Sequence, residues 1–252
     1  MPEKKRYRKK TTFGKAIART VWVLFVFSIA GFAVYAGIYL EKNTIIQEVL
    51  FTGNHFTNEQ SLFEAIDTPV GLNADSVDYR ALFNEIRQLP YVSDVTVTMT
   101  IRGVLNFRIS EHVPIAMLAD ANRRVYVSQG GIKLPVKHGK AVDVPLLHGF
   151  PVTSIADTLN TDAFRQIESF LTAAKQNDTG WITISEITWN DRKGIIALTH
   201  ENGVNVIFGK DNFHEKILNW EAFYTQVVIR KGIQHFSNID LRYKDQIVIK
   251  HS

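Results

Sequence analysis

The chain has 252 residues, with 29 Lys and Arg against 25 Asp and Glu, and it has no cysteine. Without cysteine there is no disulfide, no thiol nucleophile and no cysteine-bound zinc or iron–sulfur centre. The net charge of +4 is unevenly placed, because residues 1–20 carry eight basic residues and one acidic residue, which leaves 21 basic against 24 acidic residues elsewhere. This mildly acidic remainder argues against nucleic-acid binding, and the basic run is better interpreted as a topology signal.

Residues 21–40 form an uncharged apolar run of about 30 Å as a helix, which matches the thickness of a bilayer core. The positive-inside rule then predicts a basic cytoplasmic tail at 1–20, a transmembrane helix at 21–40 and about 210 residues on the other side. A cleaved signal peptide is the competing interpretation, with Val34-Tyr35-Ala36 as a weak cleavage box. The run is longer than a signal sequence needs, so an uncleaved anchor is favoured. Ala33 and Gly37 form a small-xxx-small pair that would suit packing against another transmembrane helix.

Residues 45–114 predict a small α/β domain in the order strand–helix–helix–strand–strand. A strand is expected at 45–51. The first helix would begin with a capping box, in which Thr57 caps and Gln60 reaches back, and Asp75 would cap the second helix. Residues 92–101 and 104–110 alternate between apolar and polar, as half-buried strands do.

Residues 115–252 predict a mixed β-sheet domain with packed helices and a C-terminal edge strand, so that the fold class is α+β. The longest helix outside the membrane carries an apolar stripe that includes Phe213, Ile217 and Trp220. We interpret this stripe as core packing rather than a cofactor site. The other expected elements are short strands at 115–119, 125–127, 132–136 and 146–147 with a turn at 120–122, a helix that begins at Thr161 or Asp162, strands at 181–189 and 195–199, a hairpin turn at 201–203, and strands at 238–243 and 247–250.

Four segments in chain order resemble one known family. They are V-L-F-T-G-N-H-F-T-N-E-Q (49–60), L-P-Y-V-S-D-V-T-V (89–97), E-H-V-P-I-A (111–116) and N-I-D-L-R-Y (238–243). The first three resemble a POTRA domain, and the set resembles the FtsQ/DivIB family of bacterial division proteins, in its FtsQ form from Gram-negative bacteria. The short basic tail and the single anchor are also this family's layout. The chain departs from the family at its end, because it stops at Ser252 without a long tail.

The resemblance implies a non-enzymatic inner-membrane scaffold of the divisome, with a periplasmic C-terminal part that is found at mid-cell. It implies binding to the FtsB–FtsL pair, links between early and late division proteins, control of septal peptidoglycan synthesis, and further divisome contacts through the POTRA domain. The short last strand would bind a partner strand by β-augmentation. The family's partner-binding Arg-Tyr pair falls on Arg242 and Tyr243. The other residues expected to bind a partner are Lys244, Ile247, Val248, Ile249 and, in a polar hairpin turn, Lys193.

Two other functions remain open at this point. A membrane-anchored export or assembly factor would use a POTRA-type domain to receive many client strands. An anchored periplasmic enzyme would need a recognisable reaction centre. The sequence contains no His-Glu-x-x-His, no Gly-x-Ser-x-Gly, no P-loop and no Gly-x-Gly-x-x-Gly. We therefore expect no catalytic residues, no cofactor, no metal and no small-molecule substrate.

Overall fold

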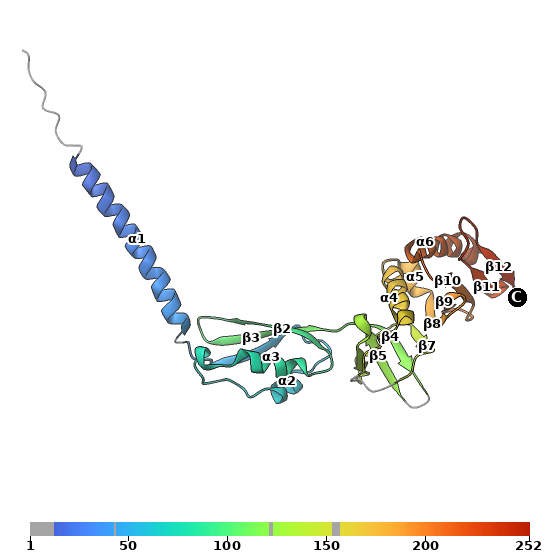
Figure 1. Cartoon of the computed structure of the whole chain (residues 1–252), viewed down its shortest axis with the longest axis horizontal. Coiled ribbons are helices and arrows are strands. Elements are labelled where there is room, and N and C mark those ends of the chain that lie inside the picture. Colours follow the sequence, from blue (N-terminus) through green and yellow to red (C-terminus); the bar gives the residue numbers. More distant parts are fainter. Residues whose placement is uncertain (1–12, 43, 121–122, 153–156) are drawn as a thin grey trace, which may run out of the picture.

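The structure is a computed structural model that describes residues 13–42, 44–120, 123–152 and 157–252. A long helix, α1 (Phe13–Lys42), is followed in a row by two units that are each built on a β-sheet (Figure 1). Most of the predicted basic tail, residues 1–12, and the predicted turn at 121–122 lie outside the described residues. The mixed α+β class predicted from the sequence is confirmed.

Helix α1 contacts little of the rest of the chain. Within it, Ala18–Gly37 is a stretch of 20 residues that is long and apolar enough to cross a membrane, and none of it is buried inside the protein. Apolar side chains exposed over such a length are unfavourable in water and require an apolar environment. The apolar helix predicted at 21–40 is therefore present, and it extends further at both ends.

The first unit contains a three-stranded sheet with the order β1-β3-β2. Strand β3 is central, and it pairs in parallel with β1, from Glu48 opposite Val104, and antiparallel with β2. The order of elements agrees with the predicted strand–helix–helix–strand–strand order. The elements are β1 (Glu48–Thr52), α2 (Glu59–Ala65), a 3-10 turn (Ala74–Ser76), α3 (Tyr79–Arg87), β2 (Val92–Met99) and β3 (Val104–Glu111).

The core of the first unit lies between the sheet and its two helices. Alternate residues of β3, Leu105, Phe107 and Ile109, are at most 2% exposed, as the alternating pattern predicts. They pack with Leu62 of α2 and Ile86 of α3, which are completely buried. Burial of each such side chain contributes about 1.5–3 kcal/mol.

The predicted capping residues of both helices were wrong by one or more positions. Helix α2 is capped by Asn58, whose side chain accepts a hydrogen bond from the Ser61 backbone N–H at 2.8 Å. Thr57 is unsuited to this role because it is buried and its backbone N–H points to the Glu111 carboxylate. In the same way α3 is capped by Asp78, and Asp75 lies in the preceding 3-10 turn.

The second unit is built on a nine-stranded mixed sheet with the order β12-β11-β10-β9-β8-β7-β4-β5-β6, which places the last strand of the chain at one edge. Its elements are β4 (Pro114–Ala119), β5 (Arg124–Ser128), a 3-10 turn (Gln129–Gly131), β6 (Lys133–Pro135), β7 (Leu146–His148), α4 (Asp162–Lys175), α5 (Asp178–Ile182), β8 (Ile184–Asn190), β9 (Gly194–Thr199), β10 (Asn205–Gly209), α6 (Phe213–Phe223), a π-helical turn (Tyr224–Val228), α7 (Ile229–Lys231), a 3-10 turn (Ile233–His235), β11 (Phe236–Asp240) and β12 (Val248–His251).

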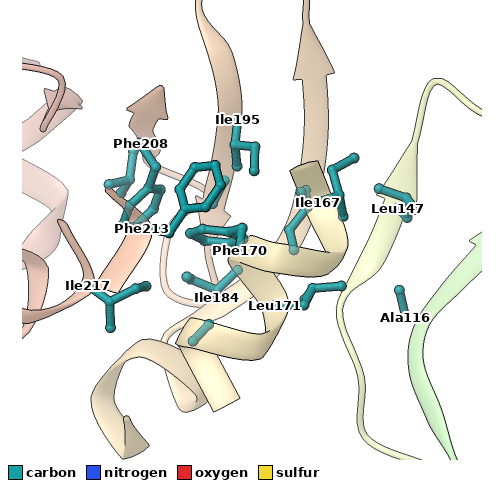
Figure 2. Close-up of a cluster of buried hydrophobic side chains, with 14 of the residues drawn as sticks. Ala116, Leu147, Ile167, Phe170, Leu171, Ile184, Ile195, Phe208, Phe213 and Ile217 are labelled. Carbon is teal, nitrogen blue, oxygen red and sulfur yellow. The ribbon is translucent and has the colours of Figure 1, made fainter. Parts of the chain in front are cut away.

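Helices α4 and α6 cover one face of this sheet, and the core of the second unit lies between these helices and the sheet (Figure 1). Figure 2 shows Phe170 of α4 beside Phe208 of β10 and Phe213 of α6, with ring centroids 4.7 and 5.6 Å away. Phe213, Ile217 and Trp220 are at most 6% exposed, so the aromatic stripe is core, as predicted. The π-helical turn then shifts the stripe by one position, so that Val228 is buried while Val227 is only partly buried against the core.

The strand predicted at 181–189 is shorter than expected. Residues 178–182 form the short helix α5, and β8 begins only at Ile184. The cause is local, because the Asn177 side chain accepts a hydrogen bond from the Gly180 N–H at 2.7 Å and so starts a helical turn. Trp181 then lies on the helix rather than on a strand.

The two units meet in a small aromatic cluster. The rings of Phe56 and Tyr91 stack at 4.5 Å between centroids and pack with Tyr126 and Leu134 of the second unit. The Tyr91 hydroxyl donates a hydrogen bond of 2.7 Å to the backbone carbonyl of Pro135. Burial, followed by the nearby Tyr126 and Glu111, raises the pKa of Tyr91 to about 12, so this hydroxyl keeps its proton at physiological pH.

A single carboxylate fixes the loop that carries Phe56. Glu111, at the end of β3, accepts hydrogen bonds of 2.7 Å from the backbone N–H groups of His55, Phe56 and Thr57. From the second unit, the Lys140 ammonium donates to the carbonyl oxygens of His55 and Phe56. The loop is therefore bound on one side by its own unit and on the other by the second unit.

Candidate partner-binding edge

Strand β12 forms an open edge of the large sheet. It pairs antiparallel with β11, with Ile249 opposite Ile239 and Val248 opposite Asp240. All four residues of β12 are exposed, including Val248 at 46% and Ile249 at 38%. Its other side meets no strand in the part of the chain that the structure describes, which leaves a row of backbone N–H and C=O groups without partners in the sheet. The predicted C-terminal edge strand is thus present.

The Arg242 side chain lies just before this edge and pairs with a carboxylate of its own chain. Its Nε donates to both oxygens of Asp240, at 2.9 and 3.1 Å, and its Nη2 donates to Oδ2 at 2.6 Å. The side chain of Asp240 is only 8% exposed, whereas that of Arg242 is 32% exposed. Burial alone would raise the pKa of Asp240, but the hydrogen bonds and charge of Arg242, with the charge of Lys193, hold it below its usual value.

The same carboxylate ends the strand earlier than predicted. A strand was expected from 238 to 243, but β11 stops at Asp240. The Arg242 backbone N–H donates to the Asp240 side chain at 3.1 Å, an Asx-type bond that competes with continued strand pairing. Arg242 and Tyr243 therefore lie in the connection between β11 and β12 rather than on a strand.

Tyr243 is 48% exposed, and the Arg242 guanidinium lies 5.8 Å from the centre of its ring. This distance is within the range of a cation–π contact, which orients the ring next to the open edge. Lys244 is exposed, while Ile247 is partly buried against the core of the second unit. The predicted residues of the connection and β12 thus form one contiguous segment.

Lys193 belongs to the same end of the sheet, although it is about 50 residues away in sequence. It lies in the turn between β8 and β9, where its backbone N–H donates to the Asn190 side chain at 2.9 Å. Its charge is close enough to lower the pKa of Asp240. The structure therefore brings Lys193 within electrostatic reach of the same buried Asp240 that pairs with Arg242.

A groove between α6 and the β11–β12 connection leads to the edge. It consists of two hollows of about 260 and 350 Å³ that share Glu215, Asn219 and Leu241 in their walls. Tyr243 lines the first hollow, and Ile247 lines the second. A partner strand placed along β12 would have this groove beside it.

Three contributors to this site were not predicted from the sequence. The first is Asp240, although its place two residues before Arg242 is the spacing of an Asx turn. The second is Gly209, where an added Cβ would lie 3.1 Å from Arg242 Cγ, so that its lack of a side chain leaves room for the arginine. The third is the π-helical turn, whose Gln226 and Val227 line the groove. Such turns are frequent at functional sites, but no sequence pattern marks this one.

The predicted helix-packing pair lies on α1, far from the edge strand in Figure 1. Ala33 and Gly37 are exposed and one turn apart. A Cβ added to Gly37 would meet no atom within 4 Å among the described residues. Gly37 thus leaves open space on this side of α1 among the described residues.

A family model described as "FtsQ/DivIB, C-terminal related" matches residues 113–249, from the end of the first unit into the first half of β12. The chain belongs to the FtsQ/DivIB family. It is 27% identical to the cell division protein FtsQ of Rhodothermus marinus, over 99% of this chain and 94% of that protein. It is 22% identical to FtsQ of Syntrophotalea carbinolica, over 93% and 82% of the two chains. As a member of this family it is a cell division protein.

A solved structure also matches part of the chain. It is the major extracytoplasmic domain of the cell division protein DivIB from Geobacillus stearothermophilus, which is 21% identical over 48% of this chain and 98% of that domain. The TM-score of 0.31 is too low for a detailed structural comparison. The assignment to the FtsQ/DivIB family depends on the sequence matches, and the family model extends through the connection into the first half of the edge strand.

Proposed function

We propose that this FtsQ/DivIB family member is a non-enzymatic, single-pass scaffold of the bacterial divisome that binds the FtsB–FtsL pair through β12. In this role it links early and late division proteins and contributes to the control of septal peptidoglycan synthesis. The observation that carries the proposal is the open edge at β12, whose four residues are exposed. Tyr243, which contacts the Arg242 guanidinium, lies in the connection just before this edge. A partner strand that pairs with this edge would satisfy its unpaired backbone groups and extend the sheet.

Side chains next to the edge would supply the specificity of the contact. Tyr243 has the exposed aromatic ring typical of interface hot spots. The Nη1 group of Arg242 makes no hydrogen bond within the described residues, so the guanidinium retains donors for a partner carboxylate while Asp240 holds it in place. Lys193 and Lys244 add positive charge at the same end of the sheet. We therefore expect the partner segment to combine a β-strand with at least one acidic residue.

The proposed topology places residues 1–20 in the cytoplasm, a membrane helix at 21–40, and a POTRA domain at 45–114 followed by a β domain at 115–252 in the periplasm. Its support is the basic excess on the N-terminal side of the apolar helix. The first unit would offer further surfaces to other divisome proteins, and Ala33 with Gly37 would offer a packing face in the membrane. Partners anchored in the same membrane would then meet this scaffold by diffusion in the plane of the membrane.

The experiment is a binding titration of the full chain, in detergent or nanodiscs, with the purified FtsB–FtsL pair. Substitution Tyr243→Ala should raise the Kd by about 30-fold or more, since hot-spot truncations cost about 2 kcal/mol or more. The matched control is Ile182→Ala, which removes a side chain that is 73% exposed on α5, away from the edge. Its Kd should be unchanged, and both variants should unfold at the temperature of the parent chain.

An unchanged Kd for Tyr243→Ala would refute the site. A chain that binds many unrelated strands weakly, and this pair no better than the others, would instead support an export or assembly factor. Saturable binding to the pair, lost on substitution at the edge, separates the scaffold from that alternative.

A further inference from the structure

One end of the first unit carries four large apolar side chains that are exposed. They are Ile45 at 51%, Val70 at 47%, Leu72 at 51% and Ile101 at 88%. They belong to three segments that are distant in sequence: the start of the unit, the loop after α2 and the turn between β2 and β3. We call this set the apolar pole. A cluster of this kind on a water-soluble surface usually marks a contact with another molecule or a membrane.

Backbone hydrogen bonds hold the three segments together. The Ile46 N–H donates to Leu72 O at 2.9 Å, and the Gly71 N–H donates back to Ile46 O at 2.8 Å. On the other side, the Gln47 N–H donates to Gly103 O at 2.8 Å. Gly103 has a φ of +80° and an added Cβ would lie 2.2 Å from Ile45 O, so the turn is closely packed against the entering chain. The apolar pole is therefore a defined surface rather than a set of independent loops.

The connection to α1 is too short to let this surface move far from the membrane. Helix α1 continues to Lys42, so the chain between the end of the apolar run at Leu40 and Ile45 could span at most about 14 Å even at the full reach of an extended chain after the helix. The interfacial layer on each side of a bilayer core is about 5–8 Å thick. Ile45 must then lie in or just beyond the headgroup region whenever α1 crosses the bilayer.

We infer that the apolar pole docks on the membrane surface, with Ile101 and its neighbours inserted at the boundary between headgroups and acyl chains. The occupant is the lipid of the bilayer that α1 crosses, because that lipid is the one apolar phase that the short connection keeps within reach at all times. Interfacial apolar groups of other proteins are buried about 5–10 Å in this way. Arg102, exposed in the same turn, is placed to meet lipid phosphates.

This contact would fix how the first unit stands on the membrane. With two anchoring points, α1 and the apolar pole, the unit would tilt less than a domain on a free hinge. The aromatic cluster at Phe56 and Tyr91 and the hydrogen bonds from the Lys140 ammonium join the second unit to the first. The height of β12 above the bilayer would then be restricted. The inference depends on α1 spanning a membrane, but not on which partner β12 binds.

The lack of cysteine allows a direct test on the full chain. Ile101→Cys is labelled with a polarity-sensitive fluorophore, and the chain is reconstituted at one copy per nanodisc of phosphatidylcholine and phosphatidylglycerol. Parallel discs contain brominated acyl chains, which quench nearby fluorophores. The expected result is a blue-shifted emission and a loss of intensity in the brominated discs. Val70→Cys should behave in the same way, so the result does not depend on one position.

Two labelled controls define the scale. Phe27→Cys, in the middle of α1, should be strongly quenched, and Ile182→Cys, in the second unit, should not be quenched. If the labels at 101 and 70 are unquenched like the label at 182 while the label at 27 is quenched, docking of the apolar pole on the membrane is refuted, and α1 is still supported as a membrane-spanning helix. If the label at 27 is also unquenched, α1 does not span the disc and the inference fails with the proposed topology. Quenching at 101 that requires two copies per disc would identify a second chain as the occupant and would also refute it.

Discussion

The Glu111 carboxylate is the group whose removal should most clearly loosen the junction between the two units. It accepts three backbone hydrogen bonds of 2.7 Å from consecutive residues, 55–57. Substitution Glu111→Gln preserves the size of the side chain but replaces one acceptor oxygen with an NH₂ donor. That NH₂ group would face backbone N–H groups, so at least one of the three donors loses its partner.

The expected cost follows from the number and type of these bonds. A hydrogen bond to a charged group contributes about 1.5–3 kcal/mol, and an unsatisfied buried donor costs a similar amount. Glu111 is only partly buried, so water replaces some of what is lost. We expect the free energy of opening of the 55–57 loop to fall by about 1–3 kcal/mol, which is roughly a 5- to 150-fold increase in its amide exchange.

Native-state hydrogen exchange of the full chain, read by mass spectrometry, measures this directly for the peptide that contains 55–57. Tyr91 and its neighbours should also exchange faster, because Phe56 stacks on Tyr91. The matched control is Glu48→Gln, which changes an exposed carboxylate on β1. Exchange of the 55–57 peptide in Glu111→Gln that equals that of the parent chain would refute the role given to this carboxylate.

The same carboxylate should make the junction sensitive to acid. Burial alone would raise the pKa of Glu111, but the backbone hydrogen bonds outweigh it and lower the pKa in the folded state. Its contribution to stability is therefore fully present above the unfolded pKa of about 4.3 and is lost as the pH falls through the folded pKa. Glu111→Gln should remove this part of the pH dependence. Parallel stability profiles of the two chains below pH 5 would contradict this prediction.

Two further substitutions test the core of the second unit. Gly194→Ala should lower the free energy of unfolding by about 2 kcal/mol or more, measured by urea denaturation, because φ is +76° and the new Cβ would lie 2.2 Å from the Gly209 backbone. Gly130→Ala, with φ +74° but open space around it, should cost clearly less, and equal costs would refute the close-contact argument. Trp220→Phe loses the 2.8 Å hydrogen bond that the indole Nε1 donates to the Thr183 hydroxyl and should lower the free energy of unfolding by about 1–3 kcal/mol, measured by circular dichroism. An unchanged free energy of unfolding would contradict this contribution, since the Thr183 hydroxyl already donates to the Thr179 carbonyl at 2.6 Å and needs no new partner.

Much of the architecture was predictable because local rules and the fold agree. The alternation along β3 placed Leu105, Phe107 and Ile109 on the buried face. The turn at Asn202 and Gly203 has φ of 57° at both residues, as the Asn-Gly pair predicts. Here periodicity and turn chemistry each require only a few neighbouring residues, so they are visible in the sequence.

Features that depend on distant or competing partners were not predictable in this way. Thr57 looks like a helix cap in sequence, but the carboxylate that binds its N–H is 54 residues away. The end of β11 depends on Asp240, which bonds Arg242 instead of continuing a strand. The approach of Lys193 to the same site follows from the order of β8 to β11 in the sheet, and that order is a property of the whole domain.

Amide exchange of β12 in the presence of the FtsB–FtsL pair tests the central claim most directly. If the partner adds a strand to the open edge, the backbone amides of Val248–His251 should be protected in the complex, and Tyr243→Ala should reduce that protection in step with affinity. Protection should fall on the edge strand and the adjoining connection more than on the strands inside the sheet, which are already paired. A tight complex in which exchange at 248–251 is unchanged would contradict binding by β-augmentation.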